Sequence, residues 1–244
     1  YAFVDAFAAL RPKVTGAGNL ERFDYWWHTL EFLRATGEMR CRWHDFNEAL
    51  EQAKAEADPA ARERAARRHA LPARMALVRA VENVYRHLLA TVSTSGELGT
   101  VCNLEQHTFP GMLDIPGAEL AELVGELPEE ARLPKDYTGG PRLIVLTKRT
   151  SLAPVEPLEV RAATLDRAPA SEAALHWRSL GEGPFTAVPM TSAGRHMVRA
   201  RLAAEDIAPT GIEYYVEARM ADNVMLRWPA TAPALCHTVL LMPE

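Results

Sequence analysis

Residues 211–233, GIEYYVEARMADNVMLRWPATAP, decide the fold of the second half of the chain. Every second residue from 212 to 220 is apolar, and the residues between them are mostly charged. A period of two places successive side chains on opposite faces, as in a strand with one face buried. The alternation stops at Ala221, Asp222 and Asn223 and resumes over 224–228. The stretch therefore predicts a β-hairpin with a short Asp/Asn turn.

The same period of two extends over the sequence on both sides of this hairpin. Seven segments show it, near residues 158–164, 173–178, 184–190, 196–202, 212–220, 224–228 and 237–242, and glycines and prolines fall between them. Short strands separated by turn residues at this spacing are typical of a two-sheet β-sandwich. We therefore expect residues 158–244 to form a seven-stranded antiparallel β-sandwich of the immunoglobulin or fibronectin III type.

The first half of the chain has a helical period instead. A stripe of large apolar residues recurs at helical spacing: Leu20, Phe23, Trp26, Trp27, Leu30 and Leu33. We expect Gly37 to end this helix, a second helix to cover about 42–57, and Asp58 and Pro59 to cap and begin a third. Pro72 should kink or divide the long apolar stripe that reaches Val92. The pattern predicts a bundle of three or four helices.

Periodicity fails after Val92, where glycine, proline and polar residues mix. We expect residues 93–116 to form a long ordered loop, and a short buried strand near 143–146 to lie in a connector of residues 136–157. The fold class is thus α+β in two domains: a helical bundle over 1–135, the connector, and the sandwich over 158–244. The chain opens without Met or a signal peptide, as expected of a piece of a longer or processed protein.

Composition narrows the function classes. The 244 residues are 48% hydrophobic and 24% charged, with a formal net charge of −5, so a large positive surface for nucleic acid is not expected. No stretch approaches the roughly 20 apolar residues of a membrane span, so no membrane partner is predicted. Phosphate-loop and zinc-protease motifs are absent, and we predict no cofactor or metal. Whether any two of Cys41, Cys102 and Cys236 pair stays open.

The predicted loop is the best place for chemistry. Glu97, Glu105 and His107 lie close together in sequence, and a carboxylate with an imidazole can serve as general acid and base. Gly96 and Gly99 would let the loop turn so that Glu97 and Glu105 approach each other. The alternative is a loop whose polar groups bind their own backbone and a neighbouring domain. The sequence therefore leaves open whether the chain is an enzyme.

Aromatic residues offer a second kind of site, because their rings can pack against sugar rings. Tyr25, Tyr215 and Trp228 are the candidates for carbohydrate binding. Structural roles compete with this interpretation. Trp228 fits the core or a domain interface, and Tyr214 is placed to point inward and to bond back to the backbone as a tyrosine corner. Trp26 and Trp27 share the apolar stripe and are expected in the core, which leaves Tyr25 and His28 exposed.

Several of these residues carry a family resemblance. EYYVEARMADNVMLRWPATAP, followed by HTVLLMP, resembles the closing hairpin of fibronectin III-like modules at the end of many secreted bacterial carbohydrate-active proteins. The matching residues are Tyr214, Tyr215, Val216, Ala218, Trp228, Pro229 and Pro233. YWWHTLEFLRATGEM and STSGELGTVCNLEQH also resemble the helical region that follows the catalytic barrel of large glycoside-hydrolase-like proteins. Cys236 departs from the pattern, which usually has a polar residue there.

The resemblance implies a bacterial, secreted or extracytoplasmic parent whose catalytic barrel is the partner of this chain, and it carries over no catalytic residue. The leading hypothesis is a non-catalytic accessory region that buttresses the barrel, and an uncovered apolar helical face would favour it. The alternative is a free-standing carbohydrate-binding or adhesion module that binds polysaccharide, with a row of exposed aromatic residues. A third hypothesis is an autonomous enzyme using the 97–107 segment in a closed cleft.

Overall fold

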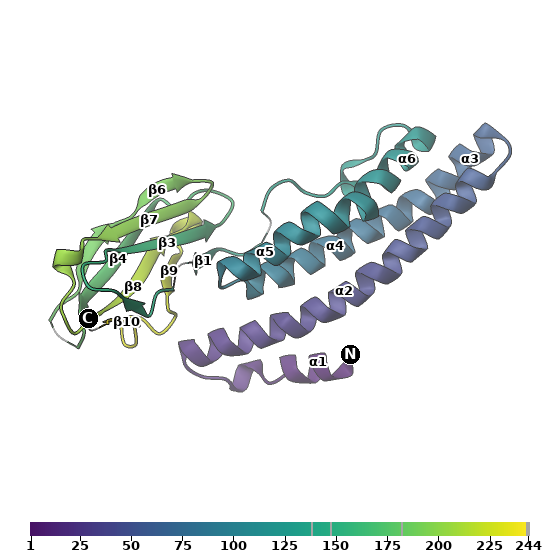
Figure 1. Cartoon of the computed structure of the whole chain (residues 1–244). Helices are drawn as coiled ribbons and strands as arrows, with labels where there is room; N and C mark the ends of the chain where they lie inside the picture. The colour runs from purple at the N-terminus through teal and green to yellow at the C-terminus, as the bar shows by residue number, and fades with distance from the viewer. Residues whose placement is uncertain (138, 147, 182, 243–244) are drawn as a thin grey trace. The chain divides into compact units, whose positions relative to one another are not determined.

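A computed structural model describes residues 1–137, 139–146, 148–181 and 183–242 (Figure 1). Contacts divide the chain into two compact units. We call the first, which holds most of the helices, the helical unit, and the second, which holds the strands, the sheet unit. The predicted α+β organisation in two parts is confirmed. Residues 138, 147, 182 and 243–244, which fall in the predicted connector and sandwich, lie outside the described residues.

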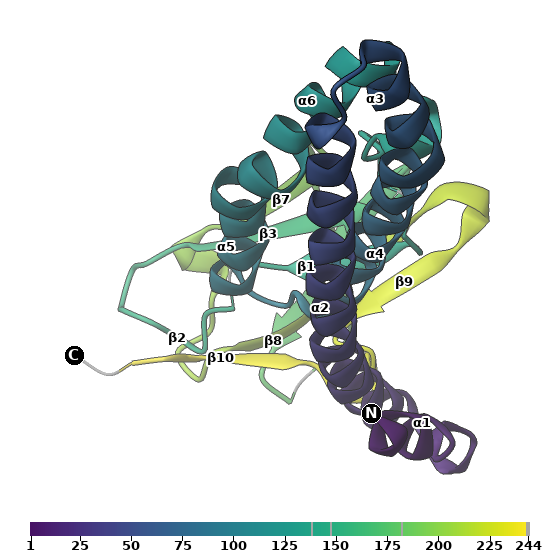
Figure 2. The same ribbon diagram turned by 90° about the vertical axis from the view of Figure 1, so that its right-hand side faces the viewer.

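The helical unit is built on two long helices, α2 and α4, that run side by side in opposite directions in Figures 1 and 2. A shared apolar core includes Phe46 of α2, Leu77 of α4 and Leu120 of α6, all almost completely buried. The helical segments are α1 (Ala2–Ala8), η1 (Arg11–Lys13), α2 (Ala17–Ala55), α3 (Pro59–Ala65), η2 (Ala66–Ala70), α4 (Leu71–Thr91), α5 (Ser95–Asn103), η3 (Leu104–Thr108), η4 (Pro110–Asp114), α6 (Ile115–Val124) and η5 (Glu129–Ala131).

One expected break in the helices comes out differently. Gly37 does not end a helix, because α2 continues through it for 39 residues. The Tyr1 hydroxyl lies 3.2 Å from where a Cβ of residue 37 would be, so Gly37 makes room for a neighbouring side chain. The start of α3 is as expected: Pro59 is at its first turn and the Ala61 N–H donates to Asp58 Oδ2 at 2.8 Å. Pro72 is the second residue of α4, which begins directly after the π-helical segment η2.

The loop expected over residues 93–116 is wrong, since this segment is mostly helical. It contains α5, the π-helical turns η3 and η4, and the start of α6. Pro110 begins η4 and Pro116 is the second residue of α6, so both prolines lie where the helical run changes between π-helical and α-helical turns. Gly117 is a packing residue, because an added Cβ would lie 3.0 Å from an Arg74 nitrogen. None of the described helices is long and apolar enough to cross a membrane.

The sheet unit consists of two sheets. Four strands pair in the order β1-β3-β7-β6, and six form the second sheet in the order β2-β10-β8-β4-β5, with β9 also paired to β8. Val160 of the first sheet and Leu175 and Val216 of the second belong to one buried core, so the sheets face each other across it. The strands are β1 (Arg142–Val145), β2 (Ser151–Leu152), β3 (Leu158–Leu165), β4 (Glu172–Ser179), β5 (Thr186–Pro189), β6 (Thr191–Gly194), β7 (Met197–Leu202), β8 (Ile212–Arg219), β9 (Met225–Trp228) and β10 (His237–Leu241).

Each of the seven predicted segments contains a strand, and the predicted hairpin is confirmed. β8 pairs antiparallel with β9, and Asp222 and Asn223 in the turn take the positive φ values that Asp and Asn tolerate. The predicted connector is part of the sheet unit, because β1 pairs with β3 and the two-residue β2 pairs with β10. The β2–β10 pairing is parallel, so this sheet is mixed. The immunoglobulin or fibronectin III type stays a prediction.

Candidate functional site

The three predicted acid–base residues do not converge on one point. Glu97 is in α5, and Glu105 and His107 are in η3, the next helical segment. Eight residues of helix separate two side chains by roughly 12 Å along the axis, so Gly96 and Gly99 do not bring Glu97 and Glu105 together. Glu105 and His107 are exposed. This segment therefore presents polar side chains on an open helical surface.

Glu105 has a structural partner. It accepts a hydrogen bond of 2.9 Å from the Tyr85 hydroxyl, and the Tyr85 ring packs on Phe109 at 5.2 Å between centroids. Burial of the phenol raises the pKa of Tyr85, and the hydrogen bond to Glu105 raises it further. Glu105 thus holds η3 against α4, which is the role that the alternative interpretation of this segment gave to its polar groups.

The aromatic candidates of the sheet unit are covered. Tyr215 is 9% exposed, because its ring stacks on His176 at 4.5 Å and Phe185 packs edge-on against it. Trp228 is half-buried and packs against the rings of Tyr214 and His237. Neither ring offers a free face of the kind that stacks on a sugar.

Tyr214 is in the core as expected, with no exposed surface. Its predicted tyrosine-corner bond is wrong, because the buried hydroxyl has no hydrogen-bond partner among the described residues. Burial raises the pKa of Tyr214, because a charged phenolate would be desolvated in the core.

The tryptophans of α2 divide between two environments. Trp27 is half-buried, with its ring 4.6 Å from that of His28 and 6.1 Å from that of His87. Trp26 is 54% exposed, so the expectation that both rings are core residues is wrong for Trp26. Tyr25, expected to be exposed, is half-buried with its ring edge-on to Trp26. Adjacent residues of a helix point about 100° apart, which is why one buried stripe cannot cover both tryptophans.

Trp26 belongs to a larger set of uncovered apolar side chains on α1, the turn after it and α2. We call this set the α1–α2 face: Tyr1 (63% exposed), Phe3 (59%), Leu10 (45%), Trp26 (54%) and Leu33 (54%). In addition, none of the residues from 17 to 30, the first third of α2, is fully buried. A cluster of exposed large apolar side chains is a candidate interaction site.

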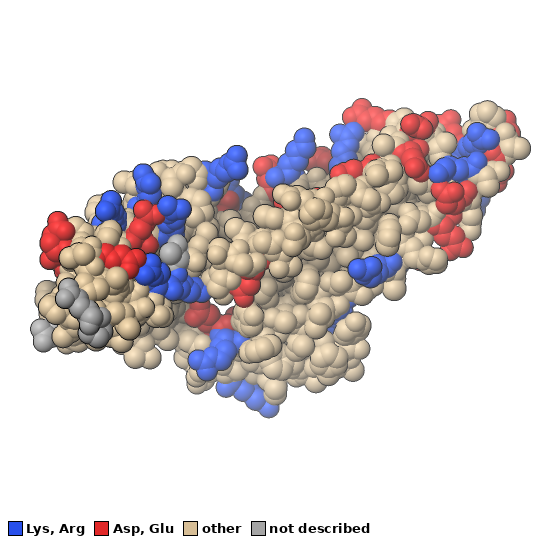
Figure 3. Space-filling view, viewed as in Figure 1, with Lys and Arg blue, Asp and Glu red and all other residues tan. Residues whose placement is uncertain are grey.

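Contacts between α1 and α2 hold the two helices of this face together. Phe7 stacks on Phe23 at 4.4 Å, and Trp26 follows Phe23 by three residues, on the same side of the helix. At the other end, the Tyr1 hydroxyl lies against Gly37, one turn beyond Leu33. Figure 3 shows the surface over α1 and the first half of α2 as mostly uncharged, with basic side chains near η1. The sequence signal for this face was the Trp26–Trp27 pair. Two adjacent tryptophans spread the apolar side of α2 over more of its circumference than one neighbouring helix can cover.

A buried polar network lies beside this face. Glu31, 5% exposed, accepts two hydrogen bonds from Arg34, which also pairs with Asp5 of α1 at 2.7 Å. His28 Nδ1 and His87 Nδ1 are 2.9 Å apart, so one imidazole donates and the other accepts. Burial lowers the pKa of His87, the charges of Arg86 and Arg34 lower it further, and Glu31 opposes them. The network fixes α1 and α4 on α2 and depends on a neutral histidine.

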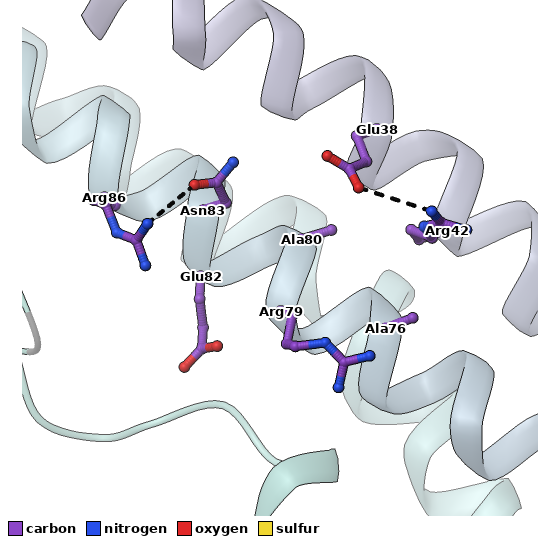
Figure 4. A pocket seen from close by; sticks show the side chains of 8 residues that line it. All are labelled: Glu38, Arg42, Ala76, Arg79, Ala80, Glu82, Asn83 and Arg86. Atoms are coloured by element: carbon purple, nitrogen blue, oxygen red, sulfur yellow. Dashed lines mark hydrogen bonds and ion pairs between the residues drawn. The ribbon is translucent and has the colours of Figure 1, made fainter.

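A surface hollow of about 530 Å³ lies between α2 and α4 (Figure 4). Ala76, Ala80 and Asn83 of α4 face Glu38 and Arg42 of α2 across it, and the longer side chains of α4 point away from α2. Glu38 and Arg42 form an ion pair at 3.9 Å. The short side chains of α4 create the hollow, and its charges largely neutralise one another.

Neither metal nor disulfide chemistry is visible in the described part of the chain. Its residues include no group of three or more His, Cys, Asp or Glu placed to hold a metal ion. The open question of cysteine pairing is answered, since all three cysteines are free, with Cys41 and Cys102 exposed and Cys236 half-buried.

Comparisons with known proteins add little. No family model matches the chain, and no curated protein matches it. Among solved structures, a chain from "Structural basis of T cell specificity and activation by the bacterial superantigen toxic shock syndrome toxin-1" aligns with a TM-score of 0.31 and 8% identity. The alignment covers 42% of this chain and 100% of that one. A likeness this weak carries no argument about function.

Proposed function

We propose that this chain is a non-catalytic accessory region of a larger, secreted glycoside-hydrolase-like protein, and that its α1–α2 face docks on the catalytic barrel of that protein. The observation that carries the proposal is the uncovered apolar face of α1 and α2, which includes Trp26 and Leu33 at 54% exposure each. The nature of the partner rests on the sequence resemblance.

The two competing hypotheses have less support. A carbohydrate-binding module would use exposed aromatic rings in a row, but Tyr215 and Trp228 are covered by other rings. An autonomous enzyme would gather its carboxylate and imidazole in a closed cleft, but Glu105 and His107 are exposed and Glu105 is bound to Tyr85. The docking role accounts for the α1–α2 face, whose apolar side chains the described part of the chain leaves exposed.

The test begins with the reading frame upstream of Tyr1, which should encode the barrel. That region is produced separately, and its association with the 244-residue chain is measured by isothermal titration calorimetry. We expect a one-to-one complex that Trp26→Ala combined with Leu33→Ser weakens at least tenfold, because central aromatic and aliphatic anchors carry most of the binding energy of an interface.

Leu235→Ser is the matched control, because Leu235 is a 68% exposed apolar residue of the sheet unit. It should leave the association unchanged. A reading frame without an upstream barrel, a barrel that does not bind, or equal effects of the two substitutions would each contradict the proposal.

A further inference from the structure

The outer face of the four-stranded sheet carries a group of arginines with an unusual arrangement. On β3 and β7 the exposed positions alternate with core positions, and the outward residues are Glu159, Arg161, Arg199 and Arg201. In the strand register Arg161 is directly opposite Arg199, and Glu159 is opposite Arg201. Like charges directly opposite each other destabilise a sheet. The Arg161–Arg199 pair therefore needs an explanation.

Internal ion pairs neutralise only part of this charge. Glu159 binds Arg161, its neighbour on the same strand. Arg199 and Arg201 form no ion pair with any residue that the structure describes, and they lie about 7 Å apart along β7. Figure 3 shows several basic side chains, with acidic ones among them, over the part of the sheet unit where β3, β6 and β7 lie, and the chain as a whole has a net charge of −5.

The surface beside these arginines is concave. A hollow of about 390 Å³ is lined by Arg199, Arg201, Glu159 and Thr191 together with the apolar side chains of Val188 and Pro189. A second hollow of about 360 Å³ shares Arg201 and has Val155, Pro157 and Glu205 in its wall. Arg201 thus lies between two hollows, each of which combines charged and apolar surface. This combination suits a ligand with anionic groups, hydroxyls and apolar ring faces.

We propose that this face, defined by Arg199, Arg201 and the two hollows beside Arg201, binds a carboxylated polysaccharide, one whose sugar units are uronic acids. A guanidinium presents a planar fork of donors that matches a carboxylate in a two-bond pairing. Val188 and Pro189 supply apolar contact for the sugar rings, and the Thr191 and Glu159 oxygens can accept hydrogen bonds from hydroxyls. Glu159 also lowers the positive charge of the hollow, which favours one carboxylate per sugar over multiply sulfated units.

This inference rests on the proposed function for its choice of carbohydrate as the ligand, and it uses a surface separate from the α1–α2 face. The experiment measures binding of the whole chain to polygalacturonate by affinity electrophoresis and calorimetry. Methyl-esterified polygalacturonate is the comparison ligand, because it keeps the sugar backbone and removes the negative charge. We expect the esterified polymer to bind at least tenfold more weakly, and higher salt to weaken binding of the acid form.

Arg199→Gln combined with Arg201→Gln should lower the affinity for polygalacturonate at least tenfold. The control variant combines Arg167→Gln with Arg227→Gln, which removes the same number of charges from exposed residues that are paired with Asp222 and Glu217. It should bind like the unchanged chain, and circular dichroism should show that both double variants are folded.

Four results would overturn the inference: no binding of polygalacturonate, equal binding of the esterified polymer, equal weakening by both double variants, or tighter binding of dextran sulfate or duplex DNA. The Trp26→Ala variant should bind polygalacturonate normally while its affinity for the barrel falls. Failure of the ligand proposal and failure of the docking proposal are therefore separate results.

Discussion

The neighbouring tryptophans of α2 should respond in opposite ways to truncation. A Trp side chain can bury roughly 250 Å². The 54% of Trp26 that is exposed in this chain therefore leaves roughly 135 Å² for a partner to cover. At about 25 cal/mol per Å² this area corresponds to about 3 kcal/mol of binding free energy. Ordering the side chain reduces the gain, so Trp26→Ala should cost about 2–3 kcal/mol, a factor of about 30–150 in the dissociation constant.

Trp27→Ala should act on stability instead. Trp27 is half-buried against His28 and His87, and truncation leaves a gap between α2 and α4. Removing a fully buried Trp side chain costs about 3–5 kcal/mol, so a loss of about 2–3 kcal/mol in the free energy of unfolding is expected for this half-buried ring. Trp26→Ala should change that free energy by less than about 1 kcal/mol, because most surface substitutions are nearly neutral.

Urea unfolding followed by circular dichroism gives the stability of each variant, and calorimetry with the barrel gives the affinity. Equal stability losses for the two variants would mean that Trp26 is buried after all. Full barrel affinity in a folded Trp26→Ala variant would remove the α1–α2 face from the docking surface.

Three further outcomes follow from single contacts. Because the lowered pKa of His87 makes the unfolded chain bind more protons in acid, the free energy of unfolding should fall as pH drops below about 6.5, and His87→Gln should flatten that dependence in urea titrations at pH 8 and pH 5. Gly211→Ala should lower the free energy of unfolding clearly more than Gly194→Ala. Both glycines have positive φ, but only a Cβ at 211 would meet backbone, at 2.2 Å. Equal losses in urea unfolding would contradict this. Arg74→Leu should lower the free energy of unfolding by about 2–4 kcal/mol, because the buried guanidinium donates to two backbone carbonyl oxygens. An unchanged midpoint of urea unfolding would show that those carbonyl oxygens find other partners.

The strands were predictable because the period of two survives wherever one face of a sheet is buried. In β8, for example, Tyr214, Val216 and Ala218 are almost completely buried and alternate with residues on the other face. The two-residue strand β2 could not be predicted, since its formation depends on pairing with β10, which is distant in sequence. Non-local pairing of this kind leaves no local pattern.

The helical half failed where glycine and proline were interpreted by their local preferences alone. Gly37 was expected to end a helix but lies within α2, where the Tyr1 side chain occupies the space that a Cβ would take. Pro110 and Pro116 are the first residue of η4 and the second of α6, in a helical run with π-helical turns that continues unbroken from α5. Tertiary contacts decide these positions, and a single sequence does not display them.

The candidate site was hidden for a related reason. An apolar stripe predicts burial, but it does not say whether the covering surface belongs to the same chain. Phe23 is partly covered by Phe7 of α1, whereas Trp26, one turn along, is not. Only the arrangement of α1 on α2 separates the two cases.

The proposed docking also has a thermodynamic consequence. In the whole protein the barrel and this chain would be joined covalently, so docking is intramolecular and takes place at a high effective concentration. An interface of a few apolar side chains can then stay closed even though the separated parts bind weakly. A partner that binds only the folded state also raises the stability of that state by mass action. Trp26→Ala should therefore leave the isolated chain stable while it lowers the stability of the helical unit within the whole protein, a difference that a purely internal role for Trp26 does not produce.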